Sequence, residues 1–249
     1  MQEAAHAAPA PSTTEDMGAR HHSAVLAVAA LGVAHAGPVA CRWSAALCRA
    51  LGVRDRLADP AAVALTFDDG PHLRGTPATL EVLRAAGIRA TFFLVGEQVE
   101  RHPQIAAEIA AAGHDVGVHC HRHRNLLRLA PAQVGEDLLR AEAAIATATG
   151  VDPRLYRPPY GILTTAALLH ARRHAFVPLL WTRWGRDWRS RATPATIEVD
   201  AAAGLCGGEV ILLHDADDHS APGSWERTVA ALPLILERIG DAGLEVRAA

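Results

Sequence analysis

Short apolar runs alternate with longer helical stretches from about residue 60 to the end of the printed chain. The apolar runs predict β-strands at 63–67, 90–95, 115–119, 155–160, 176–181, 209–214 and 244–246. The stretches between them predict helices at 76–87, 102–113, 131–150, 164–174, 193–204 and 225–240. Several of these begin at Thr or Pro and end at Gly, as helix starts and ends commonly do.

The repeated alternation of strand and helix predicts an α/β fold with parallel strands. Roughly seven β/α units in about 190 residues suit a small or incomplete barrel better than eight full units. A doubly wound open sheet is the structural alternative. In both folds functional groups gather at the C-terminal ends of the strands, so residues distant in sequence are expected to meet there.

The first 60 residues follow a different pattern. Residues 1–22 are rich in Ala, Pro, Ser and Thr, which predicts a disordered leader, and residues 61–249 form the predicted main domain. Residues 23–60 combine an apolar, helical or signal-like or anchor stretch with a linker. A membrane-spanning helix needs about 20 apolar residues, and residues 23–33 supply about half. Two interpretations stay open: an export or membrane-associated segment over residues 23–40, or a helix packed on the domain.

Composition narrows the function classes only a little. The 249 residues include 24 basic and 27 acidic side chains, and the formal net charge of -3 gives no global attraction to nucleic acid. Fourteen histidines against two tyrosines and four phenylalanines direct attention to metal or proton chemistry. The four cysteines include no CxxC pair, so we expect free thiols.

Two adjacent aspartates, Asp68 and Asp69, follow the first predicted strand and precede Gly70 and Pro71. Like charges side by side repel one another, and the repulsion is relieved when one carboxylate binds a cation and the other a proton. A turn cap before the Gly-Pro pair is the alternative explanation. The partners that would decide between these interpretations lie elsewhere in the chain.

A histidine-rich stretch after the third predicted strand supplies candidate metal ligands. His119 and His123 are spaced as HxxxH, which on one helical turn directs both imidazoles to the same side. With Asp69 they predict three protein ligands for one divalent ion, leaving positions for water and substrate. Such an ion can lower the pKa of water to about 7. A polar surface loop is the alternative, and His114 and His121 are expected at the surface or behind the ligands.

Two further strand ends carry candidate catalytic groups. In YRPPYG, residues 156–161, Arg157 is predicted to orient Asp68 as a general base, and a backbone N–H near Tyr160 to face a developing oxyanion. In ILLHD, residues 211–215, His214 can protonate a leaving amine, and Asp187 is the predicted partner that fixes its tautomer. A rigid loop, a structural histidine and an ordinary loop carboxylate are the respective alternatives.

Taken in order, TFDDGP, HxxxH, RPPYG, DW and LLHD resemble the five motifs of the polysaccharide deacetylases, the chitooligosaccharide deacetylase homology family of carbohydrate esterases. The resemblance runs from about Val63 to the C-terminus. It implies a distorted (β/α)7 barrel and metal-dependent removal of acetyl groups from N-acetylglucosamine-type sugars. The implied cofactor is one divalent ion, Zn²⁺ first and Co²⁺ or Ni²⁺ as alternatives. The implied substrate is an N-acetylated glycan such as peptidoglycan or chitin, which favours the cell envelope or secretion.

The resemblance also implies a role for each matching residue. Asp68 is the base, Arg157 tunes it, His214 is the acid and Asp187 is its partner. The implied metal ligands are Asp69, His119 and His123, and the implied substrate contacts, including the oxyanion hole, are Pro159, Tyr160, Trp188 and Leu212. Trp181, Trp184 and Trp188 either line a sugar face or fill the core.

The chain departs from the family pattern at Cys120, where the second motif usually has Ser or Thr. This thiol is expected to alter metal preference or to make the site sensitive to oxidation. Three alternative functions remain. A non-haem iron oxygenase also uses two histidines and a carboxylate, but it leaves RPPYG and His214 unexplained. A hydrolase of a non-sugar amide and a catalytically silent glycan-binding module fit the same scaffold.

Overall fold

The computed structural model describes residue 26 and residues 29–249. The predicted leader, residues 1–22, therefore lies outside the described residues. Eight strands form one parallel sheet, in the order β5-β4-β3-β2-β1-β7-β6, and β8 pairs with β1. Their bounds are β1 Ala62–Asp68, β2 Thr91–Leu94, β3 Asp115–Val118, β4 Leu155–Tyr156, β5 Val177–Pro178, β6 Arg183–Trp184, β7 Val210–His214 and β8 Glu245–Arg247.

The strand order identifies a barrel with one interruption. Consecutive strands are neighbours from β1 to β5, and β6 and β7 return to β1 on its other side, so β5 and β6 form the two edges of the curled sheet. This order confirms the predicted distorted barrel, and the doubly wound alternative is wrong. Of the strand predicted at 176–181, only Val177–Pro178 is a strand (β5), and β6 at Arg183–Trp184 was not predicted. The strand predicted at 155–160 ends at Tyr156, before Pro158 and Pro159, which cannot donate to a ladder.

Backbone from the N-terminal part of the chain covers the gap between the two sheet edges. The Arg54 N–H donates to the Pro178 carbonyl at 2.8 Å, and the Leu180 N–H donates to the Arg54 carbonyl at 2.8 Å. The Leu57 N–H donates to the Gly208 carbonyl at 2.8 Å, beside β7. The segment around residue 55 therefore takes the place of a regular strand and completes the barrel wall.

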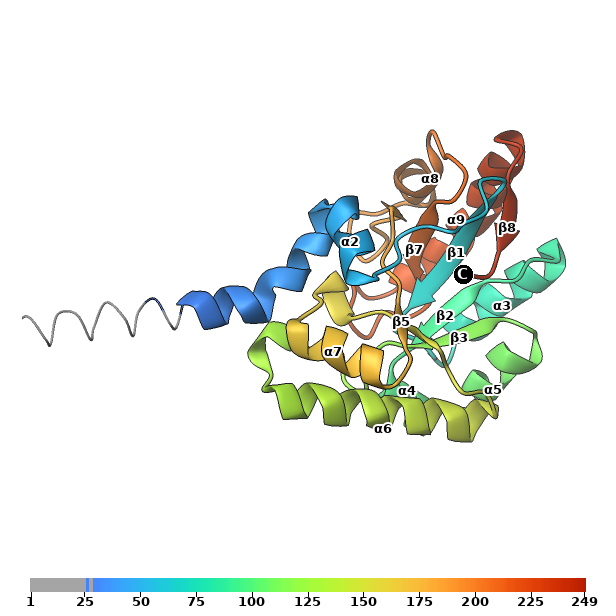
Figure 1. Ribbon diagram of the computed structural model, residues 1–249. Coiled ribbons are helices and arrows are strands. Elements are labelled where there is room, and N and C mark those ends of the chain that lie inside the picture. The colour runs from blue at the N-terminus through green and yellow to red at the C-terminus, as the bar shows by residue number, and fades with distance from the viewer. Residues whose placement is uncertain (1–25, 27–28) are drawn as a thin grey trace, which may run out of the picture.

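Helices cover the outside of the curled sheet (Figure 1). They are α3 Gly75–Ala86, α4 Gly96–Arg101, α5 Pro103–Ala111, α6 Pro131–Thr149, α7 Thr165–Arg173, α8 Pro194–Ala202 and α9 Ser224–Asp241, with 3-10 turns η2 Leu126–Arg128 and η3 Pro159–Gly161. In α6, Pro131 occupies the first turn and Gly150 ends the helix in the left-handed conformation. Its buried stripe of Val134, Leu138, Ala141 and Ile145 packs on the core, as the helical period predicts.

The N-terminal part of the described chain packs beside α7. Residues 29–36 are helical and lead into η1 Gly37–Trp43 and α2 Ala45–Leu51. These elements lie next to α7 on the left of Figure 1. The Thr165 hydroxyl donates to the Ala34 carbonyl, and Arg172 donates to the Leu51 carbonyl at 2.8 Å. Among the described residues, no helix has both the length and the apolarity needed to cross a bilayer.

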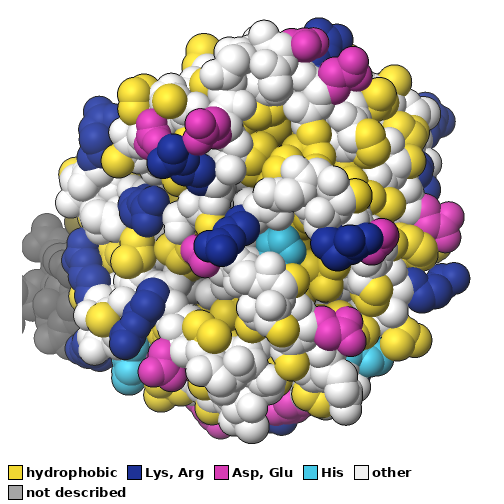
Figure 2. Space-filling view, turned by 90° about the vertical axis from the view of Figure 1, so that its right-hand side faces the viewer, with side chains coloured by type: hydrophobic (Ala, Val, Ile, Leu, Met, Phe, Trp, Pro, Cys, Tyr) yellow, Lys and Arg dark blue, Asp and Glu magenta, His cyan; other side chains and the backbone are white. Residues whose placement is uncertain are grey.

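The face on the right of Figure 1 shows acidic and basic side chains interspersed among apolar ones (Figure 2). No single sign of charge dominates this face. The pattern agrees with the nearly balanced charge of the whole sequence, which carries 24 basic and 27 acidic residues.

Candidate active site

The C-terminal ends of β1, β7 and β3 supply several of the predicted site residues. β1 ends at Asp68, and its register pairs Asp68 directly with His214 at the end of β7. His119 follows β3 on the other side of β2. Asp69 has a φ of 78°, which is a left-handed backbone conformation. Its side chain therefore does not continue the regular alternation of β1, to which Asp68 still belongs. The two aspartates therefore have different partners.

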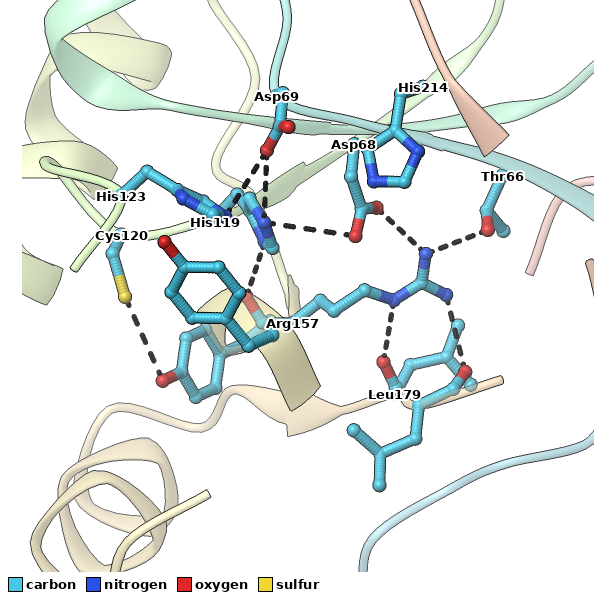
Figure 3. Close-up of polar contacts among 12 residues, drawn as sticks. Thr66, Asp68, Asp69, His119, Cys120, His123, Arg157, Leu179 and His214 are labelled. Atoms are coloured by element: carbon cyan, nitrogen blue, oxygen red, sulfur yellow. Dashed lines mark hydrogen bonds and ion pairs between the residues drawn. The ribbon is translucent and has the colours of Figure 1, made fainter. Parts of the chain in front are cut away.

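Asp69, His119 and His123 form a compact cluster whose candidate ligand atoms all lie within 4.8 Å of one another. Asp69 Oδ1 is 3.5 Å from His119 Nε2 and 3.4 Å from His123 Nε2 (Figure 3). The prediction that a helical turn aligns the histidines is wrong. β3 ends at Val118, and a loop in which Cys120 has a φ of 64° brings the two rings to 5.2 Å between centroids.

The donor atoms of this cluster fit a divalent cation. His119 Nδ1–H donates to the Arg157 carbonyl at 2.7 Å, which fixes the tautomer with the Nε2 lone pair towards Asp69. Asp69 Oδ1 is buried and has no hydrogen-bond partner among the described residues. Burial opposes its charge, but His119 and His123 outweigh burial and hold the pKa of Asp69 well below its usual range. Burial lowers the pKa of His123 to about 3, so its imidazole is neutral, as a ligand must be.

Arg157 is fully buried and joins Asp68 to the barrel wall. Its Nη1 donates to Asp68 Oδ1 at 2.8 Å and to the Thr66 hydroxyl at 2.7 Å, as Figure 3 shows. Its Nε and Nη2 donate to the carbonyls of Leu179 and Leu180 at 3.0 and 3.2 Å. Burial lowers the pKa of Arg157 while Asp68 opposes that effect. The guanidinium thus fixes one oxygen of Asp68 and leaves Asp68 Oδ2 3.7 Å from His119 Nε2.

His214 and Asp187 form the second predicted pair. The ring Nδ1–H of His214 donates to Asp187 Oδ1 at 2.8 Å, and the His214 backbone N–H donates to Asp187 Oδ2 at 2.7 Å. Burial disfavours the charged imidazole, yet Asp187, with Asp69 and Asp68 further away, raises the pKa of His214 to about 10. The imidazole is therefore protonated at neutral pH, with the Nε2 proton left for the pocket.

A cavity of about 350 Å³ joins these groups. Tyr160, which is half exposed with a φ of 59°, lies at its rim, and Trp188 and Leu212 line it, whereas Pro159 is buried and is not among its lining residues. The full lining is Arg42, Asp68, Asp69, His119, His123, Tyr160, Trp181, Trp184, Trp188, Leu212, His214, His219 and Ser220. The tryptophans at 181, 184 and 188 thus contribute to the cavity wall.

The sequence did not single out Arg42, His219 or Ser220. Arg42 comes from η1, and its Nη1 donates to the Tyr160 carbonyl at 2.7 Å. The His219 ring stacks on His123 with 4.3 Å between centroids. His214 and Asp215, which precede the loop that contains His219, were the only sequence feature that pointed to this loop. Nothing in the sequence around Arg42 indicated a role for it.

For two other histidines the sequence left two alternatives open, a surface position or one behind the ligands. His114 and His121 are buried, so the surface alternative is wrong. His114 Nδ1 accepts the Ala90 N–H at 3.1 Å, which joins the residue just before β3 to the residue just before β2, and burial lowers the pKa of His114. These histidines support the loops and strands around the candidate metal site without lining its cavity.

Cys120 is fully buried, and its sulfur lies 3.9 Å from the Tyr156 hydroxyl. Burial, followed by the nearby Asp137 charge, raises the pKa of this thiol. The thiolate is the form that reacts with oxidants and metals, so this environment opposes the expected sensitivity to oxidation. All four cysteines are free, as predicted.

His72, Asp217 and Asp218 form a second group of potential ligands. Two of these residues already have protein partners: His72 Nδ1 accepts the Gly75 N–H at 2.9 Å, and Asp217 Oδ2 accepts the Gly223 N–H at 2.6 Å. His72 Nε2 is 3.4 Å from Asp217 Oδ1. These contacts explain the group as a brace between two loops.

The curled parallel barrel, with carboxylate and imidazole groups at its strand ends, places the protein in the class of barrels with a candidate metal centre, which includes metal-dependent hydrolases. The family model for polysaccharide deacetylase matches residues 56–178. Over 184 residues the chain is 34% identical to a peptidoglycan-N-acetylglucosamine deacetylase of Bacillus cereus, a match that covers 74% of this chain and 65% of that protein. It is also 34% identical to a chitooligosaccharide deacetylase of Bradyrhizobium, of which it covers 87%.

A solved structure of a peptidoglycan N-acetylglucosamine deacetylase gives a TM-score of 0.76 at 29% identity, covering 83% of this chain and 95% of that one. The chain belongs to the polysaccharide deacetylase family of carbohydrate esterases, and is thus a hydrolase of the deacetylase class. The family-model match begins after Arg42 and ends before Asp187. The position of Arg42 in the cavity wall and the contact of Asp187 with His214 therefore come from the structure and not from the family-model match.

Proposed function

We propose that this protein hydrolyses the N-acetyl group of N-acetylglucosamine units in a poly- or oligosaccharide and releases acetate. One observation carries the proposal. Asp68 and His214, a paired acceptor and donor on adjacent strands, flank a cavity that also contains the Asp69–His119–His123 cluster. The names of the relatives support N-acetylglucosamine glycans as the substrate class.

Asp69, His119 and His123 would hold one divalent ion, with Zn²⁺ favoured by two nitrogen ligands and one carboxylate, and Co²⁺ or Ni²⁺ as alternatives. When bound, such an ion lowers the pKa of water and polarises a carbonyl oxygen. The neutral His123 and the fixed tautomer of His119 suit this role. The side chains supply the remaining steps.

Asp68 is the general base. Arg157 holds Asp68 Oδ1, so Asp68 Oδ2 faces the cluster and can take the proton that water loses as it adds to the acetyl carbon. Loss of Arg157 would leave the carboxylate without its fixed orientation. The backbone N–H of Tyr160, at the cavity rim, would donate to the carbonyl oxygen as negative charge develops there.

His214 is the general acid. Its Nε2 proton passes to the sugar nitrogen while the carbon–nitrogen bond breaks, which leaves a free amine and acetate. Asp187 keeps the imidazole protonated and oriented for this transfer. Leu212 and Trp188 offer apolar surface for the acetyl methyl group, and Trp188 packs edge-on against His214 at 5.7 Å between ring centroids.

Acetate release from N-acetylated oligosaccharides, with and without a chelator, tests the proposal. We expect release that stops with chelator and returns with Zn²⁺. Asp68→Asn should reduce turnover by at least about a hundredfold while metal binding persists, and Asp152→Asn, at an exposed loop position, is the matched control. Release only from small non-sugar amides, or glycan binding without release, would favour the two alternative functions. A peptidoglycan substrate would place the protein in the cell envelope.

A further inference from the structure

A second cavity, of about 490 Å³, adjoins the active-site cavity. Three residues, Arg42, Trp181 and Trp184, line both cavities, so the two share a wall. The other lining residues are Cys41, Trp43, Ser44, Ala45, Asp55, Arg56, Leu180, Thr182 and Glu209. A sugar chain longer than one unit can therefore extend from the active-site cavity, past these three residues, into the second cavity.

The N-terminal segment Gly37–Arg56 builds the outer side of this second cavity. Cys41 and Cys48 are buried and anchor η1 and α2 in the core, and the Cys48 thiol donates to the Cys41 carbonyl at 3.2 Å. This anchoring leaves Trp43 78% exposed next to the cavity. A tryptophan held so far into solvent loses hydrophobic stabilisation, and an exposed aromatic group beside a cavity indicates a binding surface.

The polar groups of the second cavity are balanced in charge. The lining includes two carboxylates, Asp55 and Glu209, and two guanidinium groups, Arg42 and Arg56. Glu209 Oε1 is 3.6 Å from Arg56 Nη2, and Glu209 Oε2 accepts from Arg183 Nε at 3.0 Å. Among the hydrogen bonds and ion pairs of the described residues, none uses the Asp55 carboxylate. A cavity with equal numbers of positive and negative side chains, in which the Asp55 carboxylate is left to accept hydrogen bonds, suits a neutral ligand rich in hydroxyl groups better than an anion.

Aromatic faces continue from one cavity to the other. The ring centroids of Trp181 and Trp184 are 6.1 Å apart, and those of Trp184 and Trp188 are 5.3 Å apart. The apolar C–H face of a pyranose ring packs against such surfaces, while its hydroxyls reach the polar groups beside them. The tryptophan row therefore leads from the acid His214 towards Trp43.

We propose that the second cavity is a binding subsite for the N-acetylhexosamine unit next to the one that is deacetylated. Trp43 packs on the ring of this unit and Asp55 accepts from one of its hydroxyls. The inference rests on the proposed function, because its ligand is the continuation of that substrate. The subsite makes oligosaccharides better substrates than a single sugar. Trp43 and Asp55 both precede residues 56–178, which the family model matches.

The test compares acetate release from N-acetylglucosamine oligomers of one to six units. We expect kcat/KM to rise with chain length, and Trp43→Ala to reduce the ratio of the hexamer value to the monomer value by roughly fivefold to tenfold. Trp43→Phe should keep part of the effect. Val199→Ala, which shortens an exposed apolar side chain on α8, is the control and should keep the wild-type ratio.

Binding separates failure of the subsite from failure of the proposed function. With Asp68→Asn as background, the dissociation constant for the tetramer is measured with and without Trp43→Ala and Asp55→Asn. Weaker tetramer binding in both variants supports the subsite even if no substrate is turned over. An unchanged chain-length ratio together with unchanged tetramer affinity overturns it, whatever the outcome for acetate release.

Discussion

Asp187 accepts two hydrogen bonds from the same residue, His214: the backbone N–H donates at 2.7 Å and the ring Nδ1–H at 2.8 Å. Thr228 adds a third, from its hydroxyl to Asp187 Oδ2 at 2.8 Å. One fully buried carboxylate therefore sets the position, the tautomer and the charge of the imidazole. The predictions below begin with this pair.

Asp187→Asn should lower kcat at neutral pH by about a hundredfold and move the alkaline limit of activity to lower pH. In the wild type the pKa of His214 is raised to about 10, so the acid is protonated below that pH and activity falls as pH rises through it. Without the carboxylate charge, burial lowers that pKa, and the imidazole loses its proton in the neutral range. The pH profile of kcat measures the shift.

The same pair predicts a pH-dependent stability. A pKa raised from 6.5 means that protonated His214 stabilises the fold fully below pH 6.5, and this contribution is lost as pH rises through about 10. The difference in urea midpoint between wild type and Asp187→Asn should therefore shrink from pH 6 to pH 10. Thr228→Val, which removes a single bond to Asp187, should keep the wild-type pH profile. A profile as displaced as that of Asp187→Asn would contradict the charge argument.

Arg157→Met should lower the free energy of unfolding by about 3–5 kcal/mol, because it leaves Asp68 charged and unpaired inside the barrel. The measurement is urea unfolding of the metal-free protein, which separates this effect from catalysis. Arg140→Met is the matched control, since Arg140 pairs with Glu100 at the surface, where such pairs contribute about 0–1 kcal/mol. Equal effects of the two substitutions would contradict the structural role given to Arg157.

Zn²⁺ should stabilise the protein through the Asp69–His119–His123 cluster alone. At a free concentration about 100 times its Kd, the ion should add about 2.7 kcal/mol to the free energy of unfolding, seen as a higher Tm. His119→Ala should abolish this shift. His72→Ala changes the other histidine and aspartate group and should retain it. If only His72→Ala lost the shift, the ion would bind at the His72 group and our assignment of the metal site would be wrong.

Arg42→Ala should reduce kcat on a short substrate by about tenfold with little change in KM. Arg42 donates to the carbonyl of Tyr160, whose left-handed backbone presents the N–H proposed for the oxyanion, and complete loss of such a donor costs about a hundredfold or more. Arg172→Ala is the control, because Arg172 also ties the N-terminal segment to the domain, through the Leu51 carbonyl. A fall in kcat shared by both variants would indicate general loosening of the segment.

One thiol per chain should react rapidly with iodoacetamide in the folded protein. Cys206 is exposed, whereas Cys41, Cys48 and Cys120 are buried, and burial raises the pKa of Cys48 to about 12. Peptide mapping after brief labelling should find the label at Cys206, and unfolding in urea should release the other three. Rapid labelling of Cys120 would revive the oxidation sensitivity that its place in the motif suggested.

The spacing of apolar residues along the sequence determined the alternating strands and helices, because this spacing decides which face of a helix or strand is buried. The stripe in α6 and the fully buried β1 follow from their own residues. The motif residues at strand ends were also predictable, since parallel strands end on the same side of a barrel. That rule was sufficient to bring Asp68 and His214 together.

Contacts between distant segments were decided only by the tertiary structure. HxxxH suggested a helix, but pairing of β3 ends at Val118 and a left-handed Cys120 directs both rings to Asp69. Residues 54–57 close the barrel gap through backbone hydrogen bonds, which leave no side-chain pattern in the sequence. Arg42 reaches Tyr160 across 118 positions of chain. No local spacing encodes such a meeting, because it depends on how the barrel closes and on which segment fills the space that remains.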